Sequence, residues 1–386
     1  MQTARRLLVV MFLAFTLLPT AVVGKTSSDG DLFFRGNLQR TGEQPGPGPL
    51  SDPVLQWSFM AAGPIVVGAV AVDGIVYLGS WDHYLYALDQ ATGRRVRSRF
   101  QAGAGFFSSP AYHAGVLYAG GNDGVLYAVD AATGRERWRF KANRPIWSSP
   151  AVDQGRLYVG SVDGNLYALD VENGRLLWVL ASGGAIWSSS PAISNGVGFI
   201  GAHWPDGEPF GRLLAVDLAT GAELWHARTS GGIYNSPAVS GGKVFVTSYE
   251  GALHAFDADS GTERWSTPAE LGIGSSPAVS HGTVFASGRD GFLNALSAAD
   301  GRVIWRTEYS PRLGSSAAVV GDAIYVVSEI GYLWAFDTSS GAPLWWFDTG
   351  AEAAASPVVF DGTVYVGTGH NFRGEGEGFL FAIGGT

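Results

Sequence analysis

The sequence predicts an all-β protein, an eight-bladed β-propeller of four-stranded antiparallel blades. Three observations predict it: a signature recurs at a spacing near 40 residues, each unit has four short apolar runs, and turn residues separate the runs. The signature is Ala-apolar-Asp, then a small-Gly turn and usually a tryptophan. It begins at Ala87, Ala128, Ala168, Ala215, Ala255, Ala295 and Ala335, with a truncated copy at Ala382. A helical solenoid would instead show apolar residues at helical spacing.

The third unit shows how a copy becomes a blade. Its strands are predicted at residues 148–152, 156–161, 165–170 and 175–180, and Asp, Asn and Gly fill the gaps between them. Such residues favour tight turns, so each gap is predicted to be an antiparallel hairpin.

The repeated Asp and Trp are interpreted as architecture. In the segment from Asp130 to Gly134 the carboxylate can accept turn amides while the glycine takes positive φ, which leaves the following tryptophan to pack between blades. Seven of the 13 tryptophans are predicted to dock blades in this way: Trp57, Trp138, Trp178, Trp225, Trp265, Trp305 and Trp345. The serines of the repeated Ser-Ser-Pro are strand residues for the same reason, and no catalytic residue is assigned.

Trp57 indicates how the ring closes. It lies in residues 54–59, before the first full unit, whereas the last unit ends after its third strand at residues 379–383. We therefore expect the N-terminal run to supply the outer strand of the last blade, which removes both free sheet edges.

The composition and the N-terminal segment limit the kinds of function that this protein can have. The net charge is −9 and no run of Lys or Arg appears, which argues against nucleic acid as a partner. The absence of cysteine excludes disulfides, thiolate metal sites and a lipid-modified cysteine. Residues 1–24 are predicted to be a cleaved signal peptide, 25–53 an N-terminal extension and 54–386 the propeller. We expect a monomeric periplasmic or secreted protein with no integral membrane span after cleavage.

The repeats resemble the pyrroloquinoline-quinone (PQQ) repeat, as in GRLYVGSVDGNLYALDVENGRLLW at residues 155–178. FFRGNLQRTG at residues 33–42 is similar to the lead-in segment of secreted members of that family. The resemblance implies an eight-bladed propeller. One branch holds PQQ and Ca²⁺ over the funnel with a vicinal cysteine pair, and the BamB-like branch is a bare propeller that binds proteins at the bacterial outer membrane. The length and the missing cysteines favour the BamB-like branch, although this chain also lacks the cysteine that anchors BamB as a lipoprotein.

Departures from the repeat gather on one predicted face. Insertions at residues 203–211 and 370–378 lie between the second and third strands of units four and eight, on opposite sides of the ring. Aromatic residues precede the innermost strands of units two to five, including Phe106, while Gly274, Gly314 and Ala354 hold that position in later units. The predicted binding residues on this face are Trp81, His83, Phe107, Trp147, Trp187, His203, Trp204, Glu208, Tyr234, His370, Phe372 and Glu375.

Exposed aromatic residues on a rigid scaffold suggest a surface for protein, sugar or a planar ligand, but filling gaps between inner strands explains them equally well. The His and Glu of the insertions are too dispersed for zinc, and no Ca²⁺ loop pattern exists, so no metal residue is assigned. The sequence favours a non-catalytic scaffold that binds a protein of the cell envelope. The alternatives are a PQQ- and Ca²⁺-dependent dehydrogenase of alcohols or sugars, and a sensor of a small ligand or polysaccharide.

Overall fold

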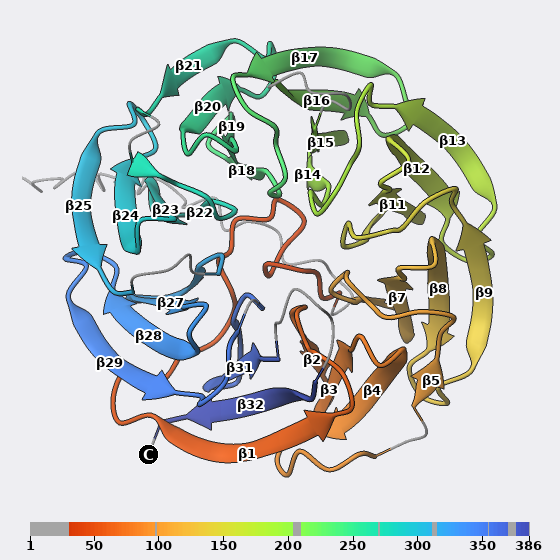
Figure 1. Ribbon diagram of the computed structural model, residues 1–386. Helices are drawn as coiled ribbons and strands as arrows, with labels where there is room; N and C mark the ends of the chain where they lie inside the picture. The colour runs from red at the N-terminus through yellow and green to blue at the C-terminus, as the bar shows by residue number, and fades with distance from the viewer. Residues whose placement is uncertain are drawn as a thin grey trace, which may run out of the picture.

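The computed structural model describes residues 31–96, 99–203, 210–268, 271–310, 315–353, 355–369 and 376–385. Over these ranges the strands form eight four-stranded antiparallel sheets that stand as blades around a ring (Figure 1). The predicted fold is therefore confirmed. None of the described segments forms a helix long and apolar enough to cross a membrane.

Each blade runs from a short inner strand to an outer strand. Blades 1 to 4 are β2 (Val70–Val72), β3 (Ile75–Gly79), β4 (Tyr84–Asp89) and β5 (Phe100–Gln101); β6 (Ala111–His113), β7 (Val116–Gly120), β8 (Val125–Asp130) and β9 (Glu136–Lys141); β10 (Ala151–Asp153), β11 (Arg156–Gly160), β12 (Asn165–Asp170) and β13 (Leu176–Ala181); and β14 (Ala192–Ser194), β15 (Val197–His203), β16 (Gly211–Asp217) and β17 (Glu223–Thr229).

Blades 5 to 8 are β18 (Ala238–Ser240), β19 (Lys243–Thr247), β20 (Leu253–Asp257) and β21 (Glu263–Ser266); β22 (Ala278–Ser280), β23 (Thr283–Ser287), β24 (Phe292–Ser297) and β25 (Val303–Glu308); β26 (Ala318–Val320), β27 (Ala323–Val327), β28 (Tyr332–Asp337) and β29 (Pro343–Asp348); and β30 (Val358–Phe360), β31 (Thr363–Gly367), β32 (Gly378–Gly384) and β1 (Val54–Ala61).

The inner strand of blade 3 begins at Ala151, so the predicted start at Ser148 was wrong. Pro150 has no amide to give to a ladder, and the two serines before it bond elsewhere. Ser148 Oγ accepts the Gly160 amide within the blade at 3.2 Å, and Ser149 Oγ accepts the Ser109 amide of blade 2 at 3.0 Å. The second kind of bond recurs between blades at Ser149–Ser190, Ser190–Ser236, Ser236–Ser276 and Ser276–Ser316. These serines thus hold neighbouring inner strands together.

The signature tryptophans lie between blades. Trp138 donates its indole N–H to the carbonyl of Val171 at 3.1 Å, and its ring covers the turn glycine Gly174, whose φ is +72°. The turn before it is closed by Asp130 Oδ1, which accepts the Thr133 amide at 2.8 Å. Equivalent indole bonds join Trp57 to Gln90, Trp178 to Leu218, Trp225 to Ala258, Trp265 to Ala298, Trp305 to Thr338 and Trp345 to Pro49.

The N-terminal strand closes the ring. β1 pairs antiparallel with β32, Trp57 opposite Ala382, and the two strands lie side by side in orange and blue in Figure 1. In blade 8 the outer strand β1 comes from the N-terminal part of the chain, so no signature turn connects it to β32 and receives the tryptophan of blade 7. Pro49 of the N-terminal extension takes that place, accepting Trp345 Nε1 at 2.8 Å. The predicted closure is therefore confirmed, and the extension completes a second contact.

Residues 31–46, the channel segment, pass through the centre of the ring (Figure 1). The segment bonds to the free edges of several inner strands, because the middle residue of each of these strands points its amide toward the segment. Amide donors to its carbonyls are Tyr112, Ile193, Val239, Val279 and Val319, at 2.7 to 2.9 Å, and the Val359 amide donates to Gln44 Oε1 at 2.6 Å. The central channel is thus occupied by the chain itself.

Candidate functional site

The face that carries the sequence departures is built from two kinds of loop. The loops between second and third strands and the approaches to the inner strands lie at the same ends of the strands, because consecutive strands alternate in direction. The contact of Trp81, between β3 and β4, with Phe107, before β6, shows this directly: their ring centroids are 4.3 Å apart. We call this side the arc face.

Six rings form one continuous arc on this face, from blade 1 to blade 5. From Trp81 and Phe107 the contacts continue to Trp147 at 5.0 Å, Trp187 at 5.0 Å and Tyr234 at 6.4 Å. Tyr249, between β19 and β20, extends it at 5.5 Å from Tyr234. The aromatic arc is therefore Trp81, Phe107, Trp147, Trp187, Tyr234 and Tyr249.

The arc ends at a cation. The Arg289 guanidinium lies 4.3 Å from the Tyr249 ring centroid, and its Nη1 donates to the Tyr249 carbonyl at 2.9 Å. Both residues occupy the loop position that Trp81 occupies in blade 1, and the sequence prediction missed them. Aligning the loops between second and third strands would have found them, since each follows a Ser or Gly at the end of the second strand.

The arc residues are only partly buried. Phe107, Trp147, Trp187 and Tyr234 are half-buried, and Tyr249 is 57% exposed. Stacked rings that keep an open side offer apolar contact area whose side chains are already ordered, which lowers the entropic cost of binding.

Phe106 does not belong to this surface. It is completely buried, and its ring packs against the position of Gly79, where a Cβ would lie 2.6 Å from the Phe106 Cβ. In the following blades Ile146, Ile186, Ile233 and Ile273 hold the same place and are also fully buried. The expectation that Phe106 enters the face was therefore wrong, because successive residues of an extended chain point to opposite sides.

His203 ends β15 beside the arc. Its ring stacks on Tyr234 with centroids 4.8 Å apart, and burial lowers its pKa, so the imidazole is neutral at neutral pH. Its Nδ1 is buried without a hydrogen-bond partner among the described residues. Trp204, Glu208, His370, Phe372 and Glu375 lie outside the described residues, as do Gly314 and Ala354. The paired raised hairpins stay a prediction.

The polar cluster of blade 1 is a turn. Asp82 accepts the amides of Ala62 at 3.0 Å and Tyr84 at 3.1 Å and the hydroxyl of Tyr86 at 2.6 Å. His83 is exposed, with φ +74°. Within the described ranges, no three His, Asp or Glu side chains group closely enough to hold a metal ion.

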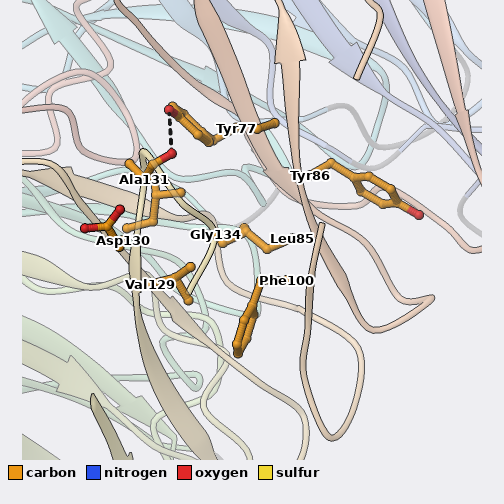
Figure 2. Close-up of a pocket in the computed structure, with 10 residues that line it drawn as sticks. Tyr77, Leu85, Tyr86, Phe100, Val129, Asp130, Ala131 and Gly134 are labelled. Atoms are coloured by element: carbon orange, nitrogen blue, oxygen red, sulfur yellow. Dashed lines mark hydrogen bonds between the residues drawn. The ribbon is translucent and has the colours of Figure 1, made fainter. Parts of the chain in front are cut away.

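A small cavity between blades 1 and 2 lies where a docking tryptophan is missing (Figure 2). Arg97 stands at the signature position that carries tryptophan in later copies, and it lies outside the described residues. The cavity is lined by Tyr77, Ala131 and Gly134, the counterparts of Tyr118, Val171 and Gly174 around Trp138. Its volume open to the centre of a water molecule is about 10 Å³, so it is a packing gap and no ligand site.

A sequence family described as outer membrane protein assembly factor BamB matches residues 81–207, 209–306 and 289–377. The chain belongs to this family. No curated protein sequence matches it.

Solved structures of the BamB type and of dehydrogenases share the fold. BamB from Moraxella catarrhalis is 18% identical with a TM-score of 0.70, and the match covers 86% of this chain and 100% of that one. A quinohemoprotein alcohol dehydrogenase from Comamonas testosteroni is 16% identical with a TM-score of 0.77, covering 91% and 80%. A europium-containing methanol dehydrogenase is 14% identical with a TM-score of 0.76, covering 92% and 97%. At such identities the likeness establishes the propeller alone.

The described residues fit a Ca²⁺-held quinone only in part. The aromatic arc supplies faces on which a planar ring system can stack. Calcium in proteins is held by several oxygen ligands, often carboxylates, and no carboxylate cluster is present among the described side chains. The vicinal cysteine pair is absent from the sequence. The arc therefore offers ring faces on which a planar group could stack.

Proposed function

We propose that this protein is an extracytoplasmic, non-catalytic propeller whose arc face binds another protein of the cell envelope. The single observation that carries the proposal is the aromatic arc, a continuous, partly exposed row of six rings over five blades. Aromatic residues of this kind dominate the binding energy of protein interfaces. Membership of the BamB family and the predicted signal peptide of residues 1–24 support a role at the envelope.

Crosslinking in the native envelope tests this proposal. In one variant a photoreactive amino acid replaces Trp187 of the arc. In a matched control variant it replaces Trp346, a residue of the outer strand β29 whose side chain is 54% exposed. We expect a discrete crosslinked protein from position 187 and none from position 346. Trp147→Ala in the same chain should weaken the crosslink, because it removes the adjacent ring of the arc. The same products from both positions, or none from position 187, would contradict the proposal.

A PQQ-dependent dehydrogenase is the second candidate, favoured by the stacked rings and by the likeness to alcohol dehydrogenases. PQQ with Ca²⁺ is titrated into the purified chain while cofactor absorbance and thermal unfolding are followed. Oxidation of alcohols or sugars is then assayed with an artificial electron acceptor. We expect no turnover; saturable binding together with turnover would replace the scaffold proposal.

A further inference from the structure

Basic residues are concentrated on the outside of blades 1 and 2. Residues 94–99 contain four arginines, and residues 135–141 contain three arginines and a lysine, so these two segments hold eight of the 25 Lys and Arg of the chain. The expectation that Lys and Arg form no run was wrong for residues 94–99. We call the two segments together the basic wall.

The fold brings the two halves of the basic wall together. They contain β5 and β9, the outer strands of adjacent blades, which are neighbours on the outside of the ring (Figure 1). Phe100, which follows Arg99, has its ring centroid 5.2 Å from that of Tyr127 in blade 2. The Arg139 guanidinium lies 5.4 Å from the same tyrosine centroid. Segments that are 40 residues apart in the sequence therefore form one surface.

The cations of the wall are open to solvent, and most of them lack a carboxylate partner. Two form ion pairs at 2.6 Å, Arg137 with Asp130 and Arg139 with Glu136. The other described cations form no ion pair with any described residue. The exposed cations of the wall are Arg94, Arg95, Arg99, Arg135, Arg137, Arg139 and Lys141, and Arg97 lies outside the described residues.

Charges of opposite sign are separated within these two blades. Residues 70–141 contain six carboxylates, and Glu136 alone lies within the wall. Others belong to turns at the strand ends: Asp82 accepts the Tyr84 amide at 3.1 Å, and Asp123 accepts the Val125 amide at 3.0 Å. The outer wall of blades 1 and 2 therefore has an excess of positive charge.

The outer strands of the other blades do not share this charge. β1, β13 and β29 contain no Lys or Arg, and β17, β21 and β25 each contain one arginine together with one glutamate. Since the whole chain has a net charge of −9, the part outside the basic wall is strongly acidic. The molecule is therefore polarised, with one basic side on its outer wall.

The shape and chemistry of the wall fit a flat anionic surface. Trp138 and Phe140 pack against the core of blade 3, and Val96 is the one large apolar side chain of the described wall that is exposed. Protein interfaces depend on aromatic or apolar anchors at their centre, which this wall lacks and the arc face has. A convex surface with long cationic side chains can instead touch a plane of anionic headgroups, to which each Lys or Arg near the surface adds attraction.

We propose that the basic wall binds the surface of a bilayer that contains anionic phospholipids, with headgroup phosphates accepting hydrogen bonds from the exposed guanidinium groups. This binding is peripheral and goes beyond the protein binding proposed for the arc face. Because the wall lies on the outside of the ring, the ring axis then runs parallel to the membrane. The arc face stays open to a partner, and the acidic part of the chain faces away from the lipid.

Vesicle flotation tests the proposal with the mature chain, purified after export and checked by mass spectrometry for loss of the apolar residues 1–24. Vesicles of phosphatidylcholine alone are compared with vesicles in which one lipid in three is phosphatidylglycerol. We expect binding only to the second kind, and we expect salt to weaken it because exposed charges are screened. Free glycerol phosphate at constant ionic strength should not displace the protein, which distinguishes a lipid surface from a single phosphate group.

A pair of double variants tests the position of the site. Arg94→Gln with Arg135→Gln should weaken binding by about tenfold or more. Arg175→Gln with Arg302→Gln is the matched control, because all four arginines are exposed and follow the turn glycine of the signature. The control changes the net charge equally in blades 3 and 6 and should leave binding unchanged. Circular dichroism verifies that both double variants are folded.

Three results would overturn the proposal. Equal losses in the two double variants would show that net charge alone attracts the protein to the vesicles. Equal binding to both kinds of vesicle would show that the anionic headgroups are not recognised. Absence of vesicle binding, combined with binding of poly-glutamate that Arg94→Gln with Arg135→Gln abolishes, would identify an acidic protein as the partner of the wall.

Discussion

Trp57, near the start of the propeller, donates its indole N–H to the carbonyl of Gln90 in blade 1 at 2.8 Å. Its ring also lies 5.8 Å from Tyr365 of blade 8, so one side chain joins the last blade to the first. Docking contacts such as Trp138 to Val171 join units adjacent in the chain, whereas this contact joins units from its opposite ends.

Trp57→Ala should destabilise the protein by about 3–5 kcal/mol, since a buried tryptophan and a buried hydrogen bond are both lost. The control Trp346→Ala removes a ring that is 54% exposed and should cost about 0.5 kcal/mol or less. Urea unfolding followed by circular dichroism measures both. Similar losses of stability in the two variants would show that the Trp57 contacts contribute no more than an exposed ring does.

Filling the gap between blades 1 and 2 should stabilise the ring. Arg97→Trp restores the signature residue, and we expect a gain of about 1 kcal/mol. At the next interface one carbonyl, Val171, accepts both Tyr118 at 3.3 Å and Trp138 at 3.1 Å, and Ala131 is expected to accept Tyr77 and the new indole in the same way.

The control for this gain is Val96→Trp, at the neighbouring position whose side chain is 43% exposed. It adds the same side chain without reaching the gap, so stability should stay unchanged or fall slightly. Chemical denaturation compares the two. A gain from Val96→Trp equal to that from Arg97→Trp would refute the packing explanation.

Alanine substitutions at two glycines with the same backbone conformation distinguish the cost of backbone strain from the cost of a packing clash. Gly174 has φ +72° and Gly155 has φ +74°, but a Cβ at Gly174 would lie 2.5 Å from Trp138 Cε3, whereas nothing lies within 4 Å at Gly155. Gly155→Ala should cost about 1–2 kcal/mol for the left-handed conformation. Gly174→Ala should cost a further 1–3 kcal/mol for the clash. Equal losses in denaturation would mean that the tryptophan moves aside freely.

Acid should weaken the turns of the signature. The Arg137 guanidinium and Thr133 hold the pKa of Asp130 near 2, and hydrogen bonds from Ser339 and Ser340 do the same for Asp337. In the unfolded chain the pKa of an Asp side chain is about 3.9. These hydrogen bonds therefore stabilise the folded state above that pH, and the stabilisation is lost as the pH falls from about 4 to about 2. Both groups lie at the surface and are partly exposed, so solvent screening keeps each contribution small.

The unfolding temperature, measured from pH 7 to pH 2, should therefore fall mainly below pH 4. Asp130→Asn should lower it at pH 7 and reduce its dependence on acid. Asp52→Asn replaces an exposed carboxylate that has no hydrogen bond among the described residues, and it should leave the pH profile unchanged. A profile of Asp130→Asn that matches the unmodified protein would contradict this explanation.

Much of the fold was predictable because the contacts that form a blade join residues close in sequence. The hairpins around Asp163 and Gly164, the turn at Asp130 and the docking of Trp138 all depend on residues within one 40-residue unit or the next. The start of β10 was misjudged because Ser149 bonds to blade 2, and Phe106 was misplaced because its neighbour Phe107 alone faces outward.

The sequence by itself determined the number of blades, their turns and the strand that closes the ring, since period, turn chemistry and a missing strand are all visible in one dimension. Only the tertiary structure decided that the arc is continuous from Trp81 to Tyr249, and that the channel segment bonds to inner strands on several sides of the ring. Both depend on contacts between distant residues. The closed ring places its inner strands around one axis, and no local pattern records which side chains meet there.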